Sequence, residues 1–261
     1  MASGYRPAPH RTRRAVRAVI TAGGTVGGDF ASAIGTSIKA LAPFGGGTLL
    51  DVAIDACEAA GIAGVAVIGG IAVRAHLRGR DVRVIDAAVD GGTNVLRAFD
   101  AWPGERFAYL TSDLPFASAD GLRDLFARSD GAALAMALGE SNAYEKRFPG
   151  APAHAVALRG DRIANGSAFV ISAEAVGPAR SLATRFFDAR KSPFALASLL
   201  GPGICLRFAT KQLRIADVEA YGTRVLGLPV MAVRGCDPGL CYDVDTLSDY
   251  AYAMSLKAST A

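Results

Sequence analysis

The sequence predicts an α/β protein, a three-layer sandwich whose central sheet is mainly parallel and which carries a small antiparallel addition. Short apolar runs, typical of buried strands, alternate with longer helical patterns over the first half of the chain. Parallel strands need such crossovers, because the chain must return to the same end of the sheet before the next strand. After residue 138 the alternation gives way to a hairpin pattern, which predicts the antiparallel part.

The first half of the chain predicts strands and helices in βαβ succession. The strands are Arg17–Thr21, Val65–Ile68, Val82–Ile85, Phe107–Thr111 and Ala133–Ala137, and the helices are Thr48–Ala60, Thr93–Ala101 and Ala119–Ala127. Ligands of such sheets bind at the carboxyl ends of the strands, where Gly23 and Asp113 both fall.

The second half begins with a polar and aromatic stretch, Glu140–Gly150, and continues with a hairpin whose turn is Gly160-Asp161. We interpret this hairpin as an antiparallel addition that covers a substrate. The remaining elements are helices at Ala173–Arg185, Pro193–Leu200 and Ile215–Leu226, a strand at Pro229–Val233 and a closing helix at Asp245–Leu256. No internal repeat or interdomain linker interrupts residues 15–261, which are therefore expected to form one domain.

Composition and charge exclude several classes of protein. The chain has 261 residues, 51% of them hydrophobic, which suffices for one substantial core. The uncharged stretch Ala59–Val73 is shorter than the roughly 20 residues that cross a bilayer, so no membrane partner is expected. Residues 1–14 are expected to form a flexible basic tail, and its arginines account for the net charge of +4, so no nucleic-acid partner is predicted. A cytoplasmic location is expected.

The four cysteines, Cys57, Cys205, Cys236 and Cys241, form no Cys-x-x-Cys pair. Buried free thiols are the usual state of such residues in a cytosolic protein. Cys236 and Cys241 flank a short loop, but no histidine lies nearby in the sequence, so metal binding by cysteine is not expected.

A phosphate site is predicted where the first strand ends. The segment Ala18-Val-Ile-Thr-Ala-Gly-Gly24 runs from a strand into paired glycines, whose backbone N–H groups can approach a phosphate without interference from side chains. Lys39 follows and supplies a positive charge, and Asp113 ends a later strand, where it can hold magnesium. Together these residues indicate nucleotide chemistry.

Two other glycine-rich motifs are excluded. Gly23–Gly28 resembles a dinucleotide fingerprint, but no clean helix is expected where that motif requires one. A P-loop is excluded because the chain contains no Gly-Lys-Ser or Gly-Lys-Thr.

Structural roles compete with the functional ones. Asp113 could cap the next segment and Lys39 could be an ordinary surface lysine, but a carboxylate that ends a buried strand is costly without a cation or donor. Asp243 and Asp245 could both cap the last helix; Asp245 is the expected cap, since it precedes Thr246 and an apolar periodic run, and Asp243 is the expected metal ligand.

Five motifs follow one another along the chain: Thr21-Ala-Gly-Gly24, Lys39-Ala-Leu with Gly47-Thr-Leu-Leu-Asp51, Asp90-Gly-Gly-Thr-Asn-Val95, Ser112-Asp-Leu-Pro115 and Tyr242-Asp-Val-Asp-Thr-Leu-Ser-Asp249. In this order they resemble the nucleotidyltransferases of the glycosyltransferase-A-type (nucleotide-diphospho-sugar transferase) fold, in particular the molybdopterin cytidylyl- and guanylyltransferase-like branch. They extend over nearly the whole chain, so the resemblance implies a nucleotide half at about residues 15–138 and an acceptor half at about residues 139–261.

The resemblance also implies residue roles. The triphosphate is contacted by Ala22, Gly23, Gly24, Thr25 and Lys39, the base or ribose by Gly91, Gly92, Thr93 and Asn94, and Mg²⁺ by Asp113 and Asp243, with Lys39 and Asp113 as catalytic residues. Gly166 and Ser167 are similar to the acceptor-facing segment of the family, although they could merely start a strand. Arg190 and Lys191 could hold an acceptor phosphate or carboxylate, or form a solvated helix start.

The implied activity is Mg²⁺-dependent transfer of a nucleoside monophosphate from a nucleoside triphosphate to a phosphorylated small molecule, such as a sugar phosphate or a cofactor precursor, with release of pyrophosphate. A glycosyltransferase and a non-catalytic nucleotide- or sugar-binding protein are the alternatives. The family commonly has an arginine in the first loop, where this chain has Asp29, and Lys39 lies further along than usual. Leu247 and Ser248 replace the usual Pro and Glu.

Overall fold

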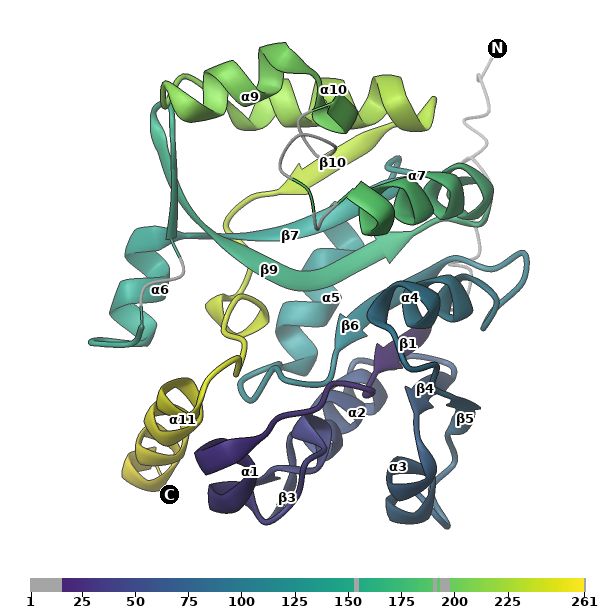
Figure 1. Cartoon of the computed structure of the whole chain (residues 1–261), viewed down its shortest axis with the longest axis vertical. Helices are drawn as coiled ribbons and strands as arrows, with labels where there is room; N and C mark the ends of the chain where they lie inside the picture. The colour runs from purple at the N-terminus through teal and green to yellow at the C-terminus, as the bar shows by residue number, and fades with distance from the viewer. Residues whose placement is uncertain (1–15, 153–154, 190–191, 193–197, 261) are drawn as a thin grey trace, which may run out of the picture.

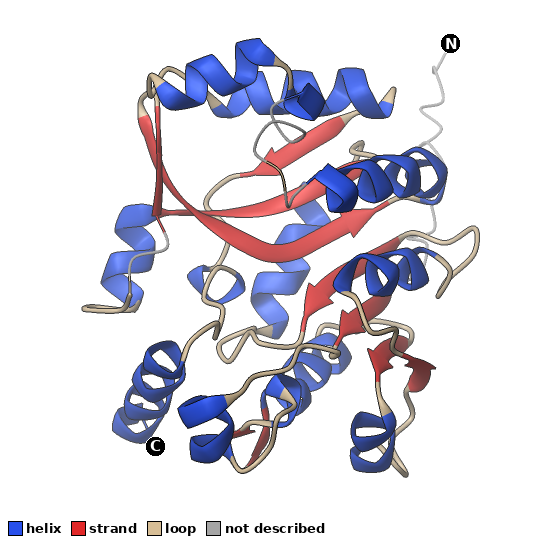
Figure 2. Cartoon of the chain, in the orientation of Figure 1, coloured by secondary structure: helices blue, strands red, loops and turns tan. Residues whose placement is uncertain are grey.

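The computed structural model describes residues 16–152, 155–189, 192 and 198–260. Its strands are β1 (Arg17–Thr21), β2 (Pro43–Phe44), β3 (Gly47–Thr48), β4 (Val65–Gly69), β5 (Arg83–Asp86), β6 (Phe107–Thr111), β7 (Leu134–Glu140), β8 (Ala155–Leu158), β9 (Asp161–Ile171) and β10 (Val230–Val233). An eight-stranded sheet has the order β10-β7-β9-β6-β1-β4-β5, with β8 paired to β9, and β2 and β3 form a separate antiparallel pair. Helices lie on both faces of the large sheet (Figures 1 and 2).

Most neighbouring strands of this sheet are parallel. β1 runs parallel to β4 and β6, β4 to β5, and β7 to β10, whereas β9 is antiparallel to β6, β7 and β8. The prediction of a mainly parallel sheet with an antiparallel addition is confirmed. Every residue of β4 is buried, as expected for a central strand covered on both faces.

The helices are α1 (Gly28–Ile34), α2 (Leu49–Ala59), α3 (Ile71–His76), α4 (Gly91–Phe99), α5 (Ala119–Arg128), α6 (Ser141–Arg147), α7 (Val176–Ala189), α9 (Pro202–Ala209), α10 (Ile215–Leu226) and α11 (Leu247–Thr260). Side chains of β1 alternate between two apolar clusters, as the pleat of a strand requires. Ala18 and Ile20 pack with residues of α2 and α5, and Val19 packs on the other face with residues of α4 and α7.

Most predicted elements agree with the structure to within a few residues, but α1 contradicts one expectation. A helix does begin directly after the glycine-rich loop, at Gly28, and ends at Gly35, whose φ of 70° is left-handed. The seven-residue helix buries only Phe30 and Ile34, one turn apart, so its periodic signal in the sequence is weak. The short helices α3, α6 and α9 were also not predicted.

Two expectations lie outside the described residues: the basic tail at residues 1–14 and most of the helix expected at Pro193–Leu200. The predicted hairpin is present, and Gly160 turns it with a left-handed φ of 81°. No helix in the described part of the chain is long and apolar enough to cross a membrane.

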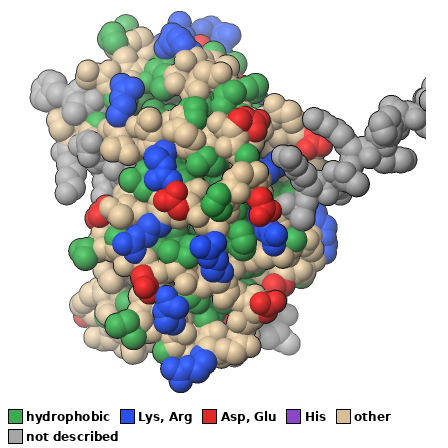
Figure 3. Space-filling view, turned by 90° about the vertical axis from the view of Figure 1, so that its right-hand side faces the viewer, with side chains coloured by type: hydrophobic (Ala, Val, Ile, Leu, Met, Phe, Trp, Pro, Cys, Tyr) green, Lys and Arg blue, Asp and Glu red, His purple; other side chains and the backbone are tan. Residues whose placement is uncertain are grey.

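Cys57, Cys236 and Cys241 are buried free thiols, and Cys205 is partly exposed. The face of the molecule drawn in Figure 3 carries Lys and Arg side chains interspersed with Asp and Glu, without a patch of one sign.

Candidate active site

The glycine loop follows β1 at the edge of the sheet where β6 also ends. Ala22 is buried, whereas Gly23, Gly24 and Thr25 are exposed. A Cβ atom on Gly23 would lie only 3.0 Å from the side-chain nitrogen of Asn94, so the loop packs tightly against the start of α4. The exposed backbone of these residues is therefore held in place by the neighbouring helix.

Asn94 has a structural reason for its position. Its buried amide accepts a hydrogen bond from the Ala88 N–H at 2.7 Å and donates one to the Ala88 carbonyl at 3.2 Å. Thr93 is held by Asp90, which caps α4 by accepting bonds from the Thr93 N–H at 2.9 Å and hydroxyl at 2.7 Å. Gly91 and Gly92 form the first turn of this helix, so the predicted base- or ribose-contacting segment is a capped helix start beside the glycine loop.

Lys39 lies next to the glycine loop despite the long connection between them. The Lys39 N–H donates to the Gly24 carbonyl at 3.0 Å, and Thr25 pairs with Ile38 in an antiparallel bridge. The segment between Thr25 and Ile38, which includes α1, forms an excursion whose two ends are paired at this bridge. The extra sequence length therefore does not separate the lysine from the loop.

The ammonium group of Lys39 contacts two carboxylates. It forms an ion pair with Asp113 Oδ2, and its Nζ atom lies 3.0 Å from Asp245 Oδ1. Burial alone acts to lower the pKa of Lys39, but Asp113 and Asp245 outweigh this effect and raise the pKa above its ordinary value. The lysine is therefore positively charged at neutral pH.

Asp113 is buried, and its other carboxylate oxygen, Oδ1, has no hydrogen-bond partner among the described residues. A buried anionic oxygen without a donor is costly, so the arrangement fits a further cation. No cluster of three or more His, Cys, Asp or Glu side chains suited to a metal occurs in the described part of the chain. A single buried carboxylate with a free oxygen is compatible with a hydrated divalent cation such as Mg²⁺, which is usually held by one or two carboxylates and takes its remaining ligands from water and phosphates.

The terminal motif lies against the end of β6. The Val244 N–H donates to the Asp113 carbonyl at 3.0 Å, which places the aspartates on both sides of Val244 near Asp113 in the fold. Asp243 accepts a hydrogen bond from the Ser167 hydroxyl at 2.7 Å. This contact links the central antiparallel strand β9 to the predicted metal ligand.

Gly166 is required by packing. A Cβ atom at this position would lie 2.5 Å from the Ala137 carbonyl oxygen and 2.8 Å from the Ala137 Cβ on β7. The register between β7 and β9 shifts between Met136 and Leu138, so Ala137 lies at an irregularity directly opposite this glycine.

Asp245 is the site residue whose role was not predicted. Instead of capping the last helix, it binds Lys39, and Thr246 forms the cap by accepting a bond from the Asp249 N–H at 3.3 Å. Asp249 reciprocates by accepting bonds from the backbone N–H groups of Asp245 and Thr246 at 3.1 and 2.7 Å. The Asp-x-Asp spacing was the available signal, since alternate residues of an extended segment lie on one side.

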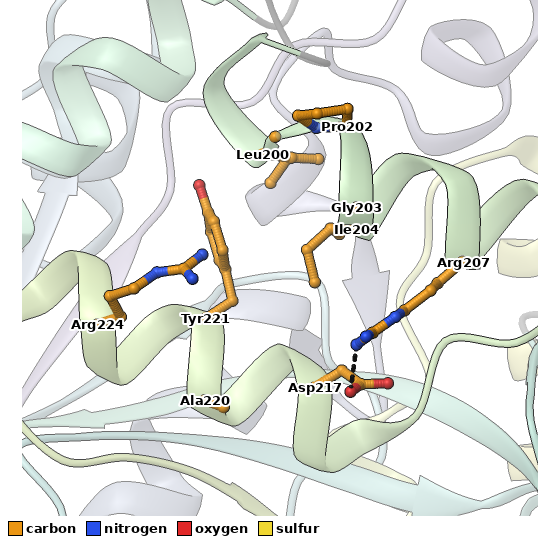
Figure 4. Close-up of a pocket in the computed structure, with 10 residues that line it drawn as sticks. Leu200, Pro202, Gly203, Ile204, Arg207, Asp217, Ala220, Tyr221 and Arg224 are labelled. Atoms are coloured by element: carbon orange, nitrogen blue, oxygen red, sulfur yellow. Dashed lines mark hydrogen bonds and ion pairs between the residues drawn. The ribbon is translucent and has the colours of Figure 1, made fainter.

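Two predicted acceptor residues, Arg190 and Lys191, lie outside the described residues. A cavity of about 380 Å³ between α9 and α10 is lined by none of the predicted site residues. In this cavity Tyr221 and Arg224 lie together on α10, and Arg207 on α9 pairs with Asp217 across the groove at 2.7 Å (Figure 4).

The fold is similar to that of several solved proteins. A hypothetical transferase from Thermus thermophilus is 26% identical, with a TM-score of 0.80 over 90% of this chain and 99% of that one. The Mycobacterium tuberculosis protein Rv0371C in complex with manganese is 18% identical, with a TM-score of 0.50 over 93% and 98%. A CMP:2-keto-3-deoxy-manno-octonic acid synthetase in complex with CTP is 14% identical, with a TM-score of 0.57 over 95% and 100%.

Among curated protein sequences, none matches the chain at a significant level. Residues 18–198 match the family model of the MobA-like NTP transferase domain. The matched range contains the glycine loop, Lys39 and Asp113. The chain therefore belongs to the MobA-like NTP transferase family and is a nucleotidyltransferase.

Proposed function

We propose that this protein transfers a nucleoside monophosphate from a nucleoside triphosphate to a phosphorylated small molecule, a sugar phosphate or a cofactor precursor, and releases pyrophosphate. The observation that carries the proposal is the Lys39–Asp113 ion pair beside Gly24, at the carboxyl ends of β1 and β6. The ammonium provides a charge for phosphates, and Asp113 has an oxygen without a described partner. This combination suits a triphosphate that arrives with a divalent cation.

We assign the triphosphate to the backbone of Ala22–Thr25 and to Lys39, and the base or ribose to residues 91–94. The close packing of Gly23 on Asn94 supports this assignment, because it keeps the two segments side by side. The Asn94 amide is already paired with Ala88, so contacts from this segment come from backbone groups rather than from that side chain.

We assign Mg²⁺ to Asp113 together with Asp243. The manganese complex of the M. tuberculosis relative supports a divalent metal in this fold. When bound, Mg²⁺ would offset negative charge on the reacting phosphate and on the pyrophosphate that leaves. Asp245 is a second candidate ligand, because its carboxylate and that of Asp113 converge on Lys39 Nζ.

The chain's own contribution to the reaction is positioning and charge. An acceptor oxygen forms a bond to the α-phosphorus on the side opposite the bond to pyrophosphate, which breaks with its electron pair going to the pyrophosphate oxygen. Glycine-loop N–H groups hold the phosphates in line for this displacement, and Lys39 stabilises the charge that develops. The acceptor is assigned to the side of Gly166 and Ser167, with Arg190 and Lys191 as proposed anion contacts.

We propose that residues 15–261 act as one catalytic unit in the cytoplasm, where nucleoside triphosphates are available. Strands from both halves of the chain share a single sheet, which supports one unit. The CTP complex of a structural relative supports a nucleoside triphosphate as donor.

One observation favours a second candidate, a protein that binds nucleotide without turning it over. Asp29 lies in the first turn of α1, in the region after the paired glycines where the family commonly has an arginine. Pyrophosphate release separates the two candidates, because both bind nucleotide but only the enzyme releases pyrophosphate when an acceptor is present.

The test is a panel of the four nucleoside triphosphates with Mg²⁺, read first by thermal shift and then by pyrophosphate release on addition of sugar phosphates and other phosphorylated acceptors. We expect acceptor-dependent release with one triphosphate, and its loss in Asp113→Asn. Asp243→Asn and Asp245→Asn, compared side by side, identify the second ligand, because only its removal abolishes metal-dependent triphosphate binding. Nucleotide binding without release for every acceptor would favour the binding protein.

A further inference from the structure

The Lys39 ammonium is paired with one oxygen of Asp113, the carboxylate that we assign to the metal ion. We propose that Lys39 is a placeholder cation: it neutralises Asp113 in the unliganded protein and is displaced from that carboxylate when metal arrives with the triphosphate. This inference rests on the proposed function, because it assumes that Asp113 binds the metal. It adds a form of control, in which the site disfavours free metal and accepts metal with nucleotide.

Charge and burial carry the first step. The side chains of Lys39 and Asp113 are only 16% and 10% exposed, so solvent screens their charges poorly. A buried carboxylate needs a counter-charge, and the lysine provides it in the absence of metal. A divalent cation on the free oxygen of the same carboxylate, Oδ1, would lie next to the ammonium on Oδ2, and the repulsion between the two cations favours movement of the ammonium away from Asp113.

The second step concerns where the ammonium goes. Asp245, whose side chain is 64% exposed, already accepts a contact from Lys39 Nζ at 3.0 Å. The backbone of Lys39 stays fixed by its bond to the Gly24 carbonyl, while the flexible four-carbon side chain can move. A Cβ on Gly24 would touch Lys39 Cε at 3.7 Å, so the side chain already runs along the proposed triphosphate loop.

A difference between free metal and metal with nucleotide follows. Free metal must displace the lysine without giving it a new anion, whereas metal bound to a triphosphate brings phosphate oxygens that the lysine can contact. Metal and triphosphate should therefore bind with positive coupling, and each should raise the affinity of the other by the same factor. The coupling should shrink when the lysine is removed.

The experiment measures Mn²⁺ binding by electron paramagnetic resonance, alone and with inorganic tripolyphosphate, which cannot donate a nucleotide. We expect Lys39→Met to bind Mn²⁺ alone about tenfold or more tightly than the wild type, because a like charge has been removed from the site. Lys146→Met is the matched control, since Lys146 is an exposed lysine on α6, and it should leave Mn²⁺ binding unchanged. Tripolyphosphate should raise Mn²⁺ affinity less in Lys39→Met than in the wild type.

The double variant Lys39→Met with Asp113→Asn should lose the increase in Mn²⁺ affinity that Lys39→Met shows, because the increase depends on the Asp113 carboxylate. Lys39→Gln, which can still donate a hydrogen bond to Asp113, is the second variant if Lys39→Met does not fold. Asp113-dependent Mn²⁺ binding that is equal or weaker without the lysine would overturn the placeholder role and leave the metal assignment standing. Absence of Asp113-dependent Mn²⁺ binding in every form would overturn both.

Discussion

Gly166→Ala tests the close packing of β9 against β7. The added Cβ would lie 2.5 Å from the Ala137 carbonyl oxygen, about 1 Å short of an ordinary contact. The obstacle is backbone in a central strand pair, so the strands must separate or shift. Overpacking of this kind costs typically 1–3 kcal/mol, and we expect about 3 kcal/mol here because no flexible side chain can yield. For a chain of this size the melting temperature should fall by roughly 6–12 °C.

Unfolding can be followed by the fluorescence of Trp102, the single tryptophan of the sequence. Gly177→Ala on α7 is the matched control, because its new Cβ would meet nothing within 4 Å; it should leave stability unchanged or raise it by up to about 1 kcal/mol. A melting temperature of Gly166→Ala equal to that of the wild type would refute the reasoning, since it would mean that the register shift between β7 and β9 accommodates the methyl group without cost.

Three further predictions concern single side chains. Ser167→Ala should weaken Mn²⁺ binding through loss of its hydrogen bond to Asp243, by about 0.5–1.5 kcal/mol in a titration, and an unchanged titration would remove Ser167 from the site. Burial tends to raise the pKa of the Asp51 carboxyl, but hydrogen bonds from the surrounding residues outweigh burial and lower this pKa below its ordinary value of 3.8. The ionised carboxylate therefore stabilises the fold above pH 3.8, and this stabilisation is lost as the pH falls through the folded-state pKa. Asp51→Asn should therefore lower the free energy of unfolding in urea by about 1 kcal/mol at pH 7, with the difference shrinking below pH 4 as the wild-type carboxyl is protonated; a difference independent of pH would contradict this. Burial, with a smaller contribution from a neighbouring glutamate, raises the pKa of the Cys57 thiol to about 12. A thiol reagent at pH 8 should therefore label the partly exposed Cys205 in the native protein and should label Cys57 only after unfolding.

The parts of the fold that could be predicted from the sequence are those in which local pattern and burial agree. β1 and β6 begin and end at the predicted residues, because each is an apolar run stopped by glycine or by a polar residue. α1 was missed because a short helix that begins and ends at glycines buries too few residues to show a period. The helical signal is stronger where a longer face is buried, as in α2, which was predicted at Thr48–Ala60 and buries Leu50, Ile54 and Cys57 among others.

In the candidate site, too, the residues of local motifs could be predicted, whereas the contacts made by tertiary packing could not. Gly23, Lys39 and Asp113 could be identified because each belongs to a local motif at a strand end. The contact of Lys39 with Asp245 joins residues 206 positions apart and depends on how the last segment crosses the sheet edge. The bond between Ser167 and Asp243 likewise depends on tertiary packing, which the sequence pattern around Gly166 does not reveal.

The place of β9 in the sheet determines how the chain could be divided into fragments. β9 is made late, yet it lies between β6 and β7, which were made earlier and do not pair with each other. A fragment that ends at residue 138 would leave those two strands without a neighbour between them, each with an unpaired backbone edge open to other chains. A fragment of residues 15–138 should therefore aggregate when produced alone and become soluble when the remainder, which contains β9, is supplied in trans.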